Sequence, residues 1–335
     1  MNSSYLYAAL LVSSSPMQSA LHPAGPQAAR IERLWWLMLW VAVAIFVAVI
    51  SVLGGALGRS RSKTAGMPPP ILETAAPDRT ATKFISVAVA ITVIVLFVLL
   101  VDSVIAGKNE TQSLVSENPV SIQVTGHQWW WEVTYPNNDA SQTLETADEI
   151  HIPVGVPVVI NTASQDVIHS FWVPNLNGKR DLIPGYSTAF WIQADKPGVY
   201  RGQCAEFCGI QHAKMAFYLV AQSKEEFQQW LQQQLKSAPE PDTEQKRRGR
   251  DVFVSNQCVM CHTIRGTIAG SRVGPDLTHI ASRMSLGAGT LPNNVGNMAA
   301  WIADPQGIKP GCRMPPNELS ADDQQALLAY LESLQ

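Results

Sequence analysis

Two cysteines, a histidine and a methionine stand within twelve residues of one another, at Cys204, Cys208, His212 and Met215, and His169 precedes them along the chain. Soft sulfur donors combined with imidazoles select copper over hard cations. Cysteines four residues apart could also bridge a pair of metal ions. The pattern therefore predicts a copper centre that cycles between two oxidation states and handles electrons.

Two other sites use some of the same residues. Structural zinc also binds two cysteines and two histidines, although a closed zinc site would not need Met215. A disulfide between Cys204 and Cys208 suits an exported domain, but it would leave the two histidines unexplained.

A second motif, Cys258-Val-Met-Cys261-His262, is the attachment signal for c-type haem. The two thiols would add to the haem vinyl groups and leave the adjacent histidine beneath the iron; zinc or a redox dithiol is the alternative. Downstream, Gly-Pro-Asp-Leu at 274–277 and Met-Pro-Pro at 314–316 resemble segments of small class I cytochromes c. An all-α haem domain is therefore expected over residues 244–335.

Met314 is the expected distal ligand of that haem, because the following Pro315 suits a loop that holds the sulfur at the iron. A histidine–methionine pair raises the haem potential, as an electron carrier requires. Met284 and Met298 are the rivals, and the helical pattern around Met298 favours a place in the core.

Two long apolar segments precede both motifs. Residues 34–57 carry no charge, and residues 84–106 are interrupted by Asp102. Each is near the ~20 residues that cross a bilayer core. A transmembrane hairpin is expected over 34–107, with buried core helices as the alternative. The net charge of −3, without a basic stripe or phosphate loop, gives no case for nucleic acid.

The loop between the spans carries more basic than acidic residues: Arg59, Arg61, Lys63, Arg79 and Lys83 against Glu73 and Asp78. The positive-inside rule places this loop in the cytoplasm. Both termini and the cofactor domains are then expected on the outer, periplasmic side of a bacterial cytoplasmic membrane. Residues 1–33 are an N-terminal arm or a cleaved signal segment, since the apolar run 5–12 lacks a basic region before it.

The segment from 118 to 222 has the pattern of an all-β sandwich. Apolar residues alternate with polar ones at 120–124 and 150–154, and turn signals recur at 136–138, 184–185 and 196–198. Residues 223–243 read as a helix capped by Ser223 and a proline-containing linker. The last helix is expected over 322–334, with Ser320 as its cap.

The motif Cys-Ala-Glu-Phe-Cys-Gly-x-x-His-x-x-Met at 204–215, with His169-Ser-Phe-Trp-Val-Pro upstream, resembles the copper A centre of subunit II of haem–copper cytochrome c oxidases. Residues 126–132 and 182–185 resemble further segments of that family. The resemblance covers roughly residues 30 to 222 and implies a cupredoxin domain after two membrane spans. With the fused haem domain, the chain looks like the caa3 type.

The resemblance implies a role for each site residue. Cys204 and Cys208 would bridge two coppers, with His169 and His212 as terminal ligands. The weak ligands would be the Met215 sulfur on one copper and the Glu206 carbonyl on the other. The Glu206 side chain would face a magnesium site at subunit I. Trp129, with Trp130 as runner-up, would lie between the electron donor and the copper centre.

These features together predict a subunit that receives electrons for a terminal respiratory oxidase. Haem c would pass electrons to copper A and on to subunit I, where oxygen is reduced to water. A bc-type complex or a cytochrome c would be the donor. The alternatives are the copper A subunit of a nitric oxide reductase, a nitrous oxide reductase and a copper-assembly module. The spans and the haem tail argue against nitrous oxide reductase, and a chaperone needs no haem domain.

Overall fold

The computed structural model describes residues 17–63, 79–112 and 120–335. The chain divides into two compact units, one of which is the helical segment from Arg30 to Gln112. The other joins the residues that precede this segment to the β-domain and the haem domain that follow it.

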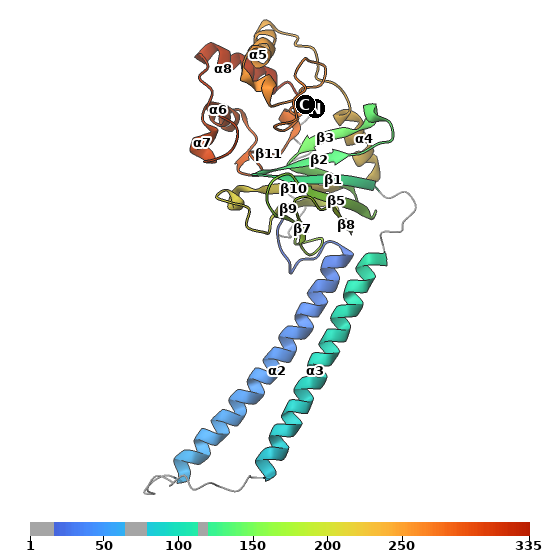
Figure 1. Cartoon of the computed structure of the whole chain (residues 1–335), viewed down its shortest axis with the longest axis vertical. Coiled ribbons are helices and arrows are strands. Elements are labelled where there is room, and N and C mark those ends of the chain that lie inside the picture. The colour runs from blue at the N-terminus through green and yellow to red at the C-terminus, as the bar shows by residue number, and fades with distance from the viewer. Residues whose placement is uncertain (1–16, 64–78, 113–119) are drawn as a thin grey trace. The chain divides into compact units, whose positions relative to one another are not determined.

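The first unit consists of two long helices, α2 (Pro26–Lys63) and α3 (Arg79–Gln112) (Figure 1). Both contain stretches that are long and apolar enough to cross a membrane, Pro26–Arg59 and Arg79–Ile105. Large apolar side chains such as Phe46 and Phe97 are exposed along them. Exposure of these apolar side chains to water is unfavourable, whereas contact with lipid tails is not. The predicted spans lie inside these helices, and the apolar run 5–12 lies outside the described residues.

The β-domain is built from two five-stranded sheets. One sheet has the order β3-β2-β1-β5-β8 and the other β4-β10-β9-β6-β7, and β1–β5 and β4–β10 are parallel pairs. The strands are β1 (Val120–His127), β2 (Trp130–Tyr135), β3 (Leu144–Ala147), β4 (Glu149–Pro153), β5 (Val158–Ser164), β6 (His169–Trp172), β7 (Arg180–Leu182), β8 (Thr188–Ile192), β9 (Gly198–Cys204) and β10 (Ala216–Gln222). The predicted β-sandwich is confirmed.

Alternating apolar residues build the core between the two sheets. In β1 and β5 the inward positions Ile122, Val124, Val158 and Ile160 are fully buried. The Phe217 ring of β10 lies over its cross-strand partner Gly202 on β9, where a Cβ would come within 2.2 Å of the ring. This pairing explains why the strand that ends at Cys204 carries a glycine there.

Phe217→Ala should destabilise the β-domain by about 3–5 kcal/mol, because the removed ring leaves a cavity that the rigid sheets cannot close. The ring is fully buried and packs against Trp131 and Phe171, with centroid distances of 5.4 and 4.6 Å. Denaturant unfolding measures the loss, and Phe217→Leu, which keeps most of the volume, should cost clearly less. Equal losses for the two variants would contradict this packing account.

A segment before α2 is hydrogen-bonded to the β-domain. Arg201 N donates to Met17 O, Ala24 N to Asn175 O and Asp195 N to Ala24 O, at 2.8, 2.7 and 2.7 Å. The sequence predicted only an arm or a signal segment here. Pairing of this kind has no periodic signature, because each bond joins residues that are distant along the chain.

Helix α4 (Lys224–Gln234) follows the β-domain, and Ser223 caps it as predicted, in a reciprocal capping box with Glu226. The haem domain then contains α5 (Glu244–Ser255), α6 (Val295–Ala303), α7 (Pro305–Ile308) and α8 (Ala321–Leu331), with the short strands β11 (Ser285–Leu286) and β12 (Leu291–Pro292). Short 3-10 turns are η2 (Ala140–Gln142), η3 (His212–Lys214), η4 (Gln257–Met260) and η5 (Ile280–Ser282). Ser320 caps α8 as predicted.

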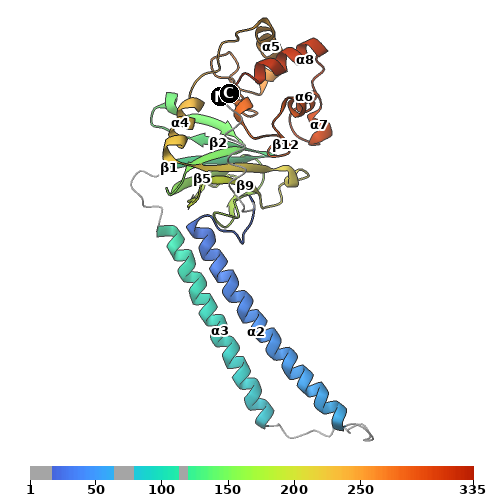
Figure 2. The ribbon, with the colours of Figure 1, turned by 180° about the vertical axis from the view of Figure 1, so that it is seen from behind.

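Helices α5, α6 and α8 lie close together in the haem domain (Figure 2). Helices α5 and α8 cross closely at Gly249, where a Cβ would come within 2.0 Å of the Ala326 carbonyl. Phe253 of α5, Ile302 of α6 and Tyr330 of α8 are buried in one cluster. The predicted helical haem domain is therefore confirmed, and Met298 is buried in this cluster as its pattern indicated.

Candidate metal and haem centres

The β9–β10 hairpin positions the sulfur-rich segment. Cys204 ends β9, Met215 immediately precedes β10, and Cys204 N donates to Met215 O at 2.8 Å. The intervening loop is therefore closed at its base. His169 opens β6, which pairs with β9 through Phe171 opposite Cys204. Pairing of these strands thus brings His169 beside two cysteines that lie far from it in sequence.

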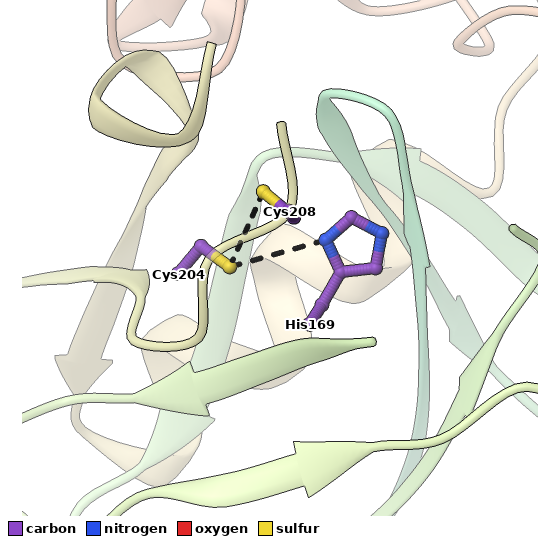
Figure 3. Close-up of side chains that lie close together, drawn as sticks. All are labelled: His169, Cys204 and Cys208. Carbon is purple, nitrogen blue, oxygen red and sulfur yellow. Dashed lines mark hydrogen bonds between the residues drawn. The ribbon is translucent and has the colours of Figure 1, made fainter. Parts of the chain in front are cut away.

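The donor atoms of this segment converge on one small volume. Cys204 Sγ lies 3.7 Å from Cys208 Sγ and 3.9 Å from His169 Nδ1 (Figure 3). On the other side, Cys208 Sγ lies 3.6 Å from His212 Nδ1 and 3.8 Å from Met215 Sδ. The Glu206 carbonyl oxygen lies 3.1 Å from Cys204 Sγ. All six predicted copper ligands are therefore brought together.

These donors fit copper better than a hard cation. Side-chain donors of His169, Cys204 and Cys208 lie within 4.8 Å of one another, and all three residues are buried. Met215 is fully buried as well, with its thioether against Cys208. Thiolate, imidazole and thioether form a soft donor set with two sulfurs in bridging positions. The cysteines are free thiols, so the structure does not contain the alternative disulfide between them.

The two thiols titrate as a pair. The hydrogen bond between the two sulfurs lowers the pKa of Cys204 to about 3, against the effect of burial. The same hydrogen bond and burial raise the pKa of Cys208. One proton is therefore shared between the sulfurs, and a metal that binds both must displace it.

Asp166 orients the first histidine. Its Oδ1 lies 2.8 Å from His169 Nε2, so the imidazole directs Nδ1 towards the sulfurs. Although burial opposes it, hydrogen bonds to Cys204 and Asp166 raise the pKa of His169. A carboxylate on the outer nitrogen is a common support for a metal-binding histidine. Asp166 was not predicted from the sequence, where its only signal is an acidic residue three positions before the histidine.

Asp166→Asn should lower copper affinity by roughly tenfold to a hundredfold, because the amide holds the imidazole less firmly and donates less charge to it. Competition between the copper-loaded protein and a chelator of known affinity measures the effect. Asp195→Asn, at an exposed aspartate of the same domain, is the matched control and should leave the affinity unchanged. An unaltered affinity in Asp166→Asn would show that the carboxylate plays no part in the site.

The haem motif lies at the end of α5, on and after the turn η4. The thiols of Cys258 and Cys261 are free and half-buried. His262 Nδ1 donates to Pro275 O at 2.8 Å, which leaves Nε2 available to bind a metal, and burial lowers the pKa of this imidazole. Gly274 lies against the ring, since a Cβ there would come within 2.8 Å of His262 Cε1. This donor set fits a covalently attached haem with a fixed axial histidine.

Met314 lies in a loop held by one glutamine. Gln306 Nε2 donates to Cys312 O and Met314 O at 2.6 and 2.8 Å, and Gly311 N donates to Gln306 Oε1 at 2.9 Å. The Met314 side chain packs against the haem-domain core with Cys258. Met314 thus lies at the edge of this core, whereas Met298 is enclosed in it. Gln306 carries no sequence signal, since a surface glutamine would look the same.

The three neighbouring tryptophans have different surroundings. Trp129 is buried, and its Nε1 donates to Cys208 O at 2.9 Å. Trp130 stacks on His127 with ring centroids 4.4 Å apart, and Trp131 is fully buried in the core. The structure thus puts Trp129 in direct contact with the backbone of a predicted copper ligand.

Comparisons with known proteins agree with these two centres. Residues 120–222 match the family described as cytochrome C oxidase subunit II, periplasmic domain, and residues 247–335 match the family described as cytochrome c. The cytochrome c oxidase subunit 2 of Alkalihalophilus pseudofirmus is 36% identical over 323 residues, which cover 94% of this chain and 90% of that protein. The cytochrome c oxidase subunit 2 of Bacillus subtilis is 27% identical over 339 residues, which cover 95% and 92%.

Among solved structures, the periplasmic domain of subunit II of cytochrome oxidase from Bradyrhizobium japonicum is 30% identical, covers 36% of this chain and 96% of its own, and has a TM-score of 0.33. The similarity to the Alkalihalophilus protein extends over the membrane helices, the β-domain and the haem domain. This chain therefore belongs to the cytochrome c oxidase subunit II family, as the membrane-anchored, electron-receiving subunit of a haem–copper oxidase in the caa3-type arrangement with a fused cytochrome c domain.

Proposed function

We propose that this subunit carries electrons from haem c to a dinuclear copper A centre through the residues named above. Cys204 and Cys208 bridge the coppers, and His169 and His212 are the terminal ligands. The Met215 sulfur and the Glu206 carbonyl are the weak ligands. Cys258 and Cys261 attach the haem, and His262 and Met314 are its axial ligands.

The separation of the two cysteine sulfurs, 3.7 Å, is the observation that carries this proposal. It leaves room for metal ions between the sulfurs, and one histidine stands on either side of the pair. Copper in this soft shell supplies a one-electron couple. The chain's own contribution is a fixed geometry, because the ligand loop is closed by a strand hairpin and His169 is held by Asp166.

We further propose that the cofactor domains and both termini lie on the periplasmic side, as the basic loop between the helices indicates. Subunit I accepts the electrons, and a bc-type complex or a cytochrome c supplies them. The Glu206 carboxylate, which pairs with Lys179 Nζ at 2.7 Å, would exchange this partner for a magnesium ion at the subunit I interface.

The order of reduction tests the relay. The purified oxidase, with all its subunits, is mixed rapidly with a reduced cytochrome c while haem c and copper A are followed by their separate absorption bands. Haem c should be reduced first, and copper should follow at the rate at which haem c is reoxidised. Copper reduction that precedes haem c reduction would refute the relay.

A further inference from the structure

A tight turn lies just before the predicted distal ligand. In Lys309-Pro310-Gly311-Cys312, Cys312 N donates to Lys309 O at 3.1 Å, and Gly311 has φ of +83°. Proline in the second position and a left-handed glycine in the third define a type II turn. The turn belongs to the loop that carries Met314, two residues beyond its end.

This turn packs directly on Trp129. A Cβ on Gly311 would lie 3.0 Å from Ile210 Cδ1 and 3.6 Å from the Trp129 ring. Beside it, Gln211 Nε2 donates to Pro310 O at 2.8 Å. Trp129 Nε1 in turn donates a hydrogen bond to Cys208 O. A continuous series of contacts therefore runs from the Met314 loop through Trp129 to a proposed copper ligand.

A buried lysine at the first position of the turn joins it to the backbone of Trp129. Lys309 is only 2% exposed, and its Nζ donates to Trp129 O at 2.7 Å and to Gly287 O at 2.8 Å. Burial lowers its pKa to about 8, although Asp148 opposes this shift. A buried ammonium group costs desolvation energy, so it is tolerated only where carbonyls and a counter-charge receive it.

The charges across the contact between the β-domain and the haem domain are complementary. The β-domain contributes acidic groups and the haem domain contributes their partners: Arg272 pairs with Glu145 at 2.7 Å, Met284 N donates to Glu149 at 2.9 Å, and Arg313 lies 3.9 Å from Asp166. Complementary charges fix the register of an interface more than they add affinity. These acidic groups of the β-domain therefore face the chain's own haem domain.

We propose that Lys309 is a positioning residue that holds the 309–312 turn on Trp129, and that electrons enter the copper centre through this contact. The inference rests on the proposed function. In each transfer one electron leaves the reduced haem and enters the oxidised copper pair, with no bond formed or broken and no proton moved. Because the turn covers Trp129, a separate carrier protein must deliver its electrons to the haem domain.

Lys309→Met tests the proposal in the complete oxidase, since methionine keeps most of the length and removes the ammonium group. After light-driven reduction of haem c by an attached ruthenium complex, electron transfer to copper should slow by about tenfold or more, because the haem domain leaves its docked position. The optical spectrum of haem c and the electron paramagnetic resonance signal of copper should stay unchanged. Lys246→Met, which breaks a partly exposed pair with Asp242, is the control and should transfer electrons at the wild-type rate.

Gly311→Ala is a second variant that leaves the lysine in place. A Cβ in the left-handed conformation, against Ile210 and Trp129, should slow the same step, whereas Gly270→Ala, where a Cβ has open space, should not. If both Lys309→Met and Gly311→Ala transferred electrons from haem c to copper at the wild-type rate, the proposal would be overturned. If the wild-type oxidase and all of its variants lacked the copper or the haem spectrum, the proposed function itself would be wrong.

A third test needs no variant. In the wild-type oxidase, an amine-acylating reagent followed by mass spectrometry should modify Lys309 at least about tenfold more slowly than Lys246. If the turn were not docked, Lys309 would be open to the reagent and should react about as fast as Lys246. Modification of Lys309 at the rate of Lys246 or above would show that the turn is not docked on Trp129.

Discussion

Serine in place of either Cys204 or Cys208 should abolish the electron paramagnetic resonance signal of one electron shared by two coppers, while haem c is retained in full. Both sulfurs lie between the histidines, 3.7 Å apart, so each is needed to bridge. A serine oxygen is a harder donor that binds copper weakly in its place. The haem motif is formed by other elements and should not respond.

Cys312→Ser is the matched control for this experiment. Cys312 is also a free cysteine, but its Sγ lies near Gln306 Nε2 in the haem domain. The variant should keep the copper signal and the covalent haem. A shared-electron signal that survived in Cys204→Ser or Cys208→Ser would show that the bridging assignment is wrong.

Met314→Ala should keep the covalent haem but lower its reduction potential, by on the order of 0.1 V or more, because axial ligands set haem potentials over a wide range. Loss of the sulfur also opens the iron, so the reduced haem should bind carbon monoxide. The attachment residues Cys258 and Cys261 are unaffected by the change. Redox titration and carbon monoxide difference spectra measure the two effects.

Two other methionines serve as controls for Met314. Met298→Ala should cost about 2–5 kcal/mol of stability, because Met298 is buried in the haem-domain core, but it should leave the potential unchanged. Met284→Ala should also leave the potential unchanged. If the haem reduction potential fell in Met298→Ala or in Met284→Ala but kept its wild-type value in Met314→Ala, the methionine replaced in that control would be the distal ligand.

The sequence predicted which donor side chains lie together, because residue type and spacing encode this grouping. Cys204, Cys208, His212 and Met215 lie on one short loop, so local spacing was sufficient to bring them together. The sandwich was predictable for a similar reason, since apolar and polar residues alternate in the segments that form β1 and β4. The first residues of helices such as α4 were predictable because a capping residue, here Ser223, makes short-range hydrogen bonds to the first turn.

The residues that support these sites could not be predicted in the same way. Asp166 acts on His169 only because a turn places its carboxylate on the outer nitrogen. Lys309 reads as an ordinary surface lysine, and its burial depends on Trp129, which lies 180 residues away in sequence. The hydrogen bonds of Met17 and Ala24 to the β-domain are equally non-local. Long-range contacts of this kind leave no periodic pattern in a single sequence.

Electron paramagnetic resonance of the full-length chain, combined with metal and haem analysis, tests the central claim most directly. We expect two coppers and one covalent haem per chain, with a hyperfine pattern from one electron shared over both coppers. A single-copper spectrum, or zinc in place of copper, would contradict the dinuclear centre and with it the relay from haem c to subunit I.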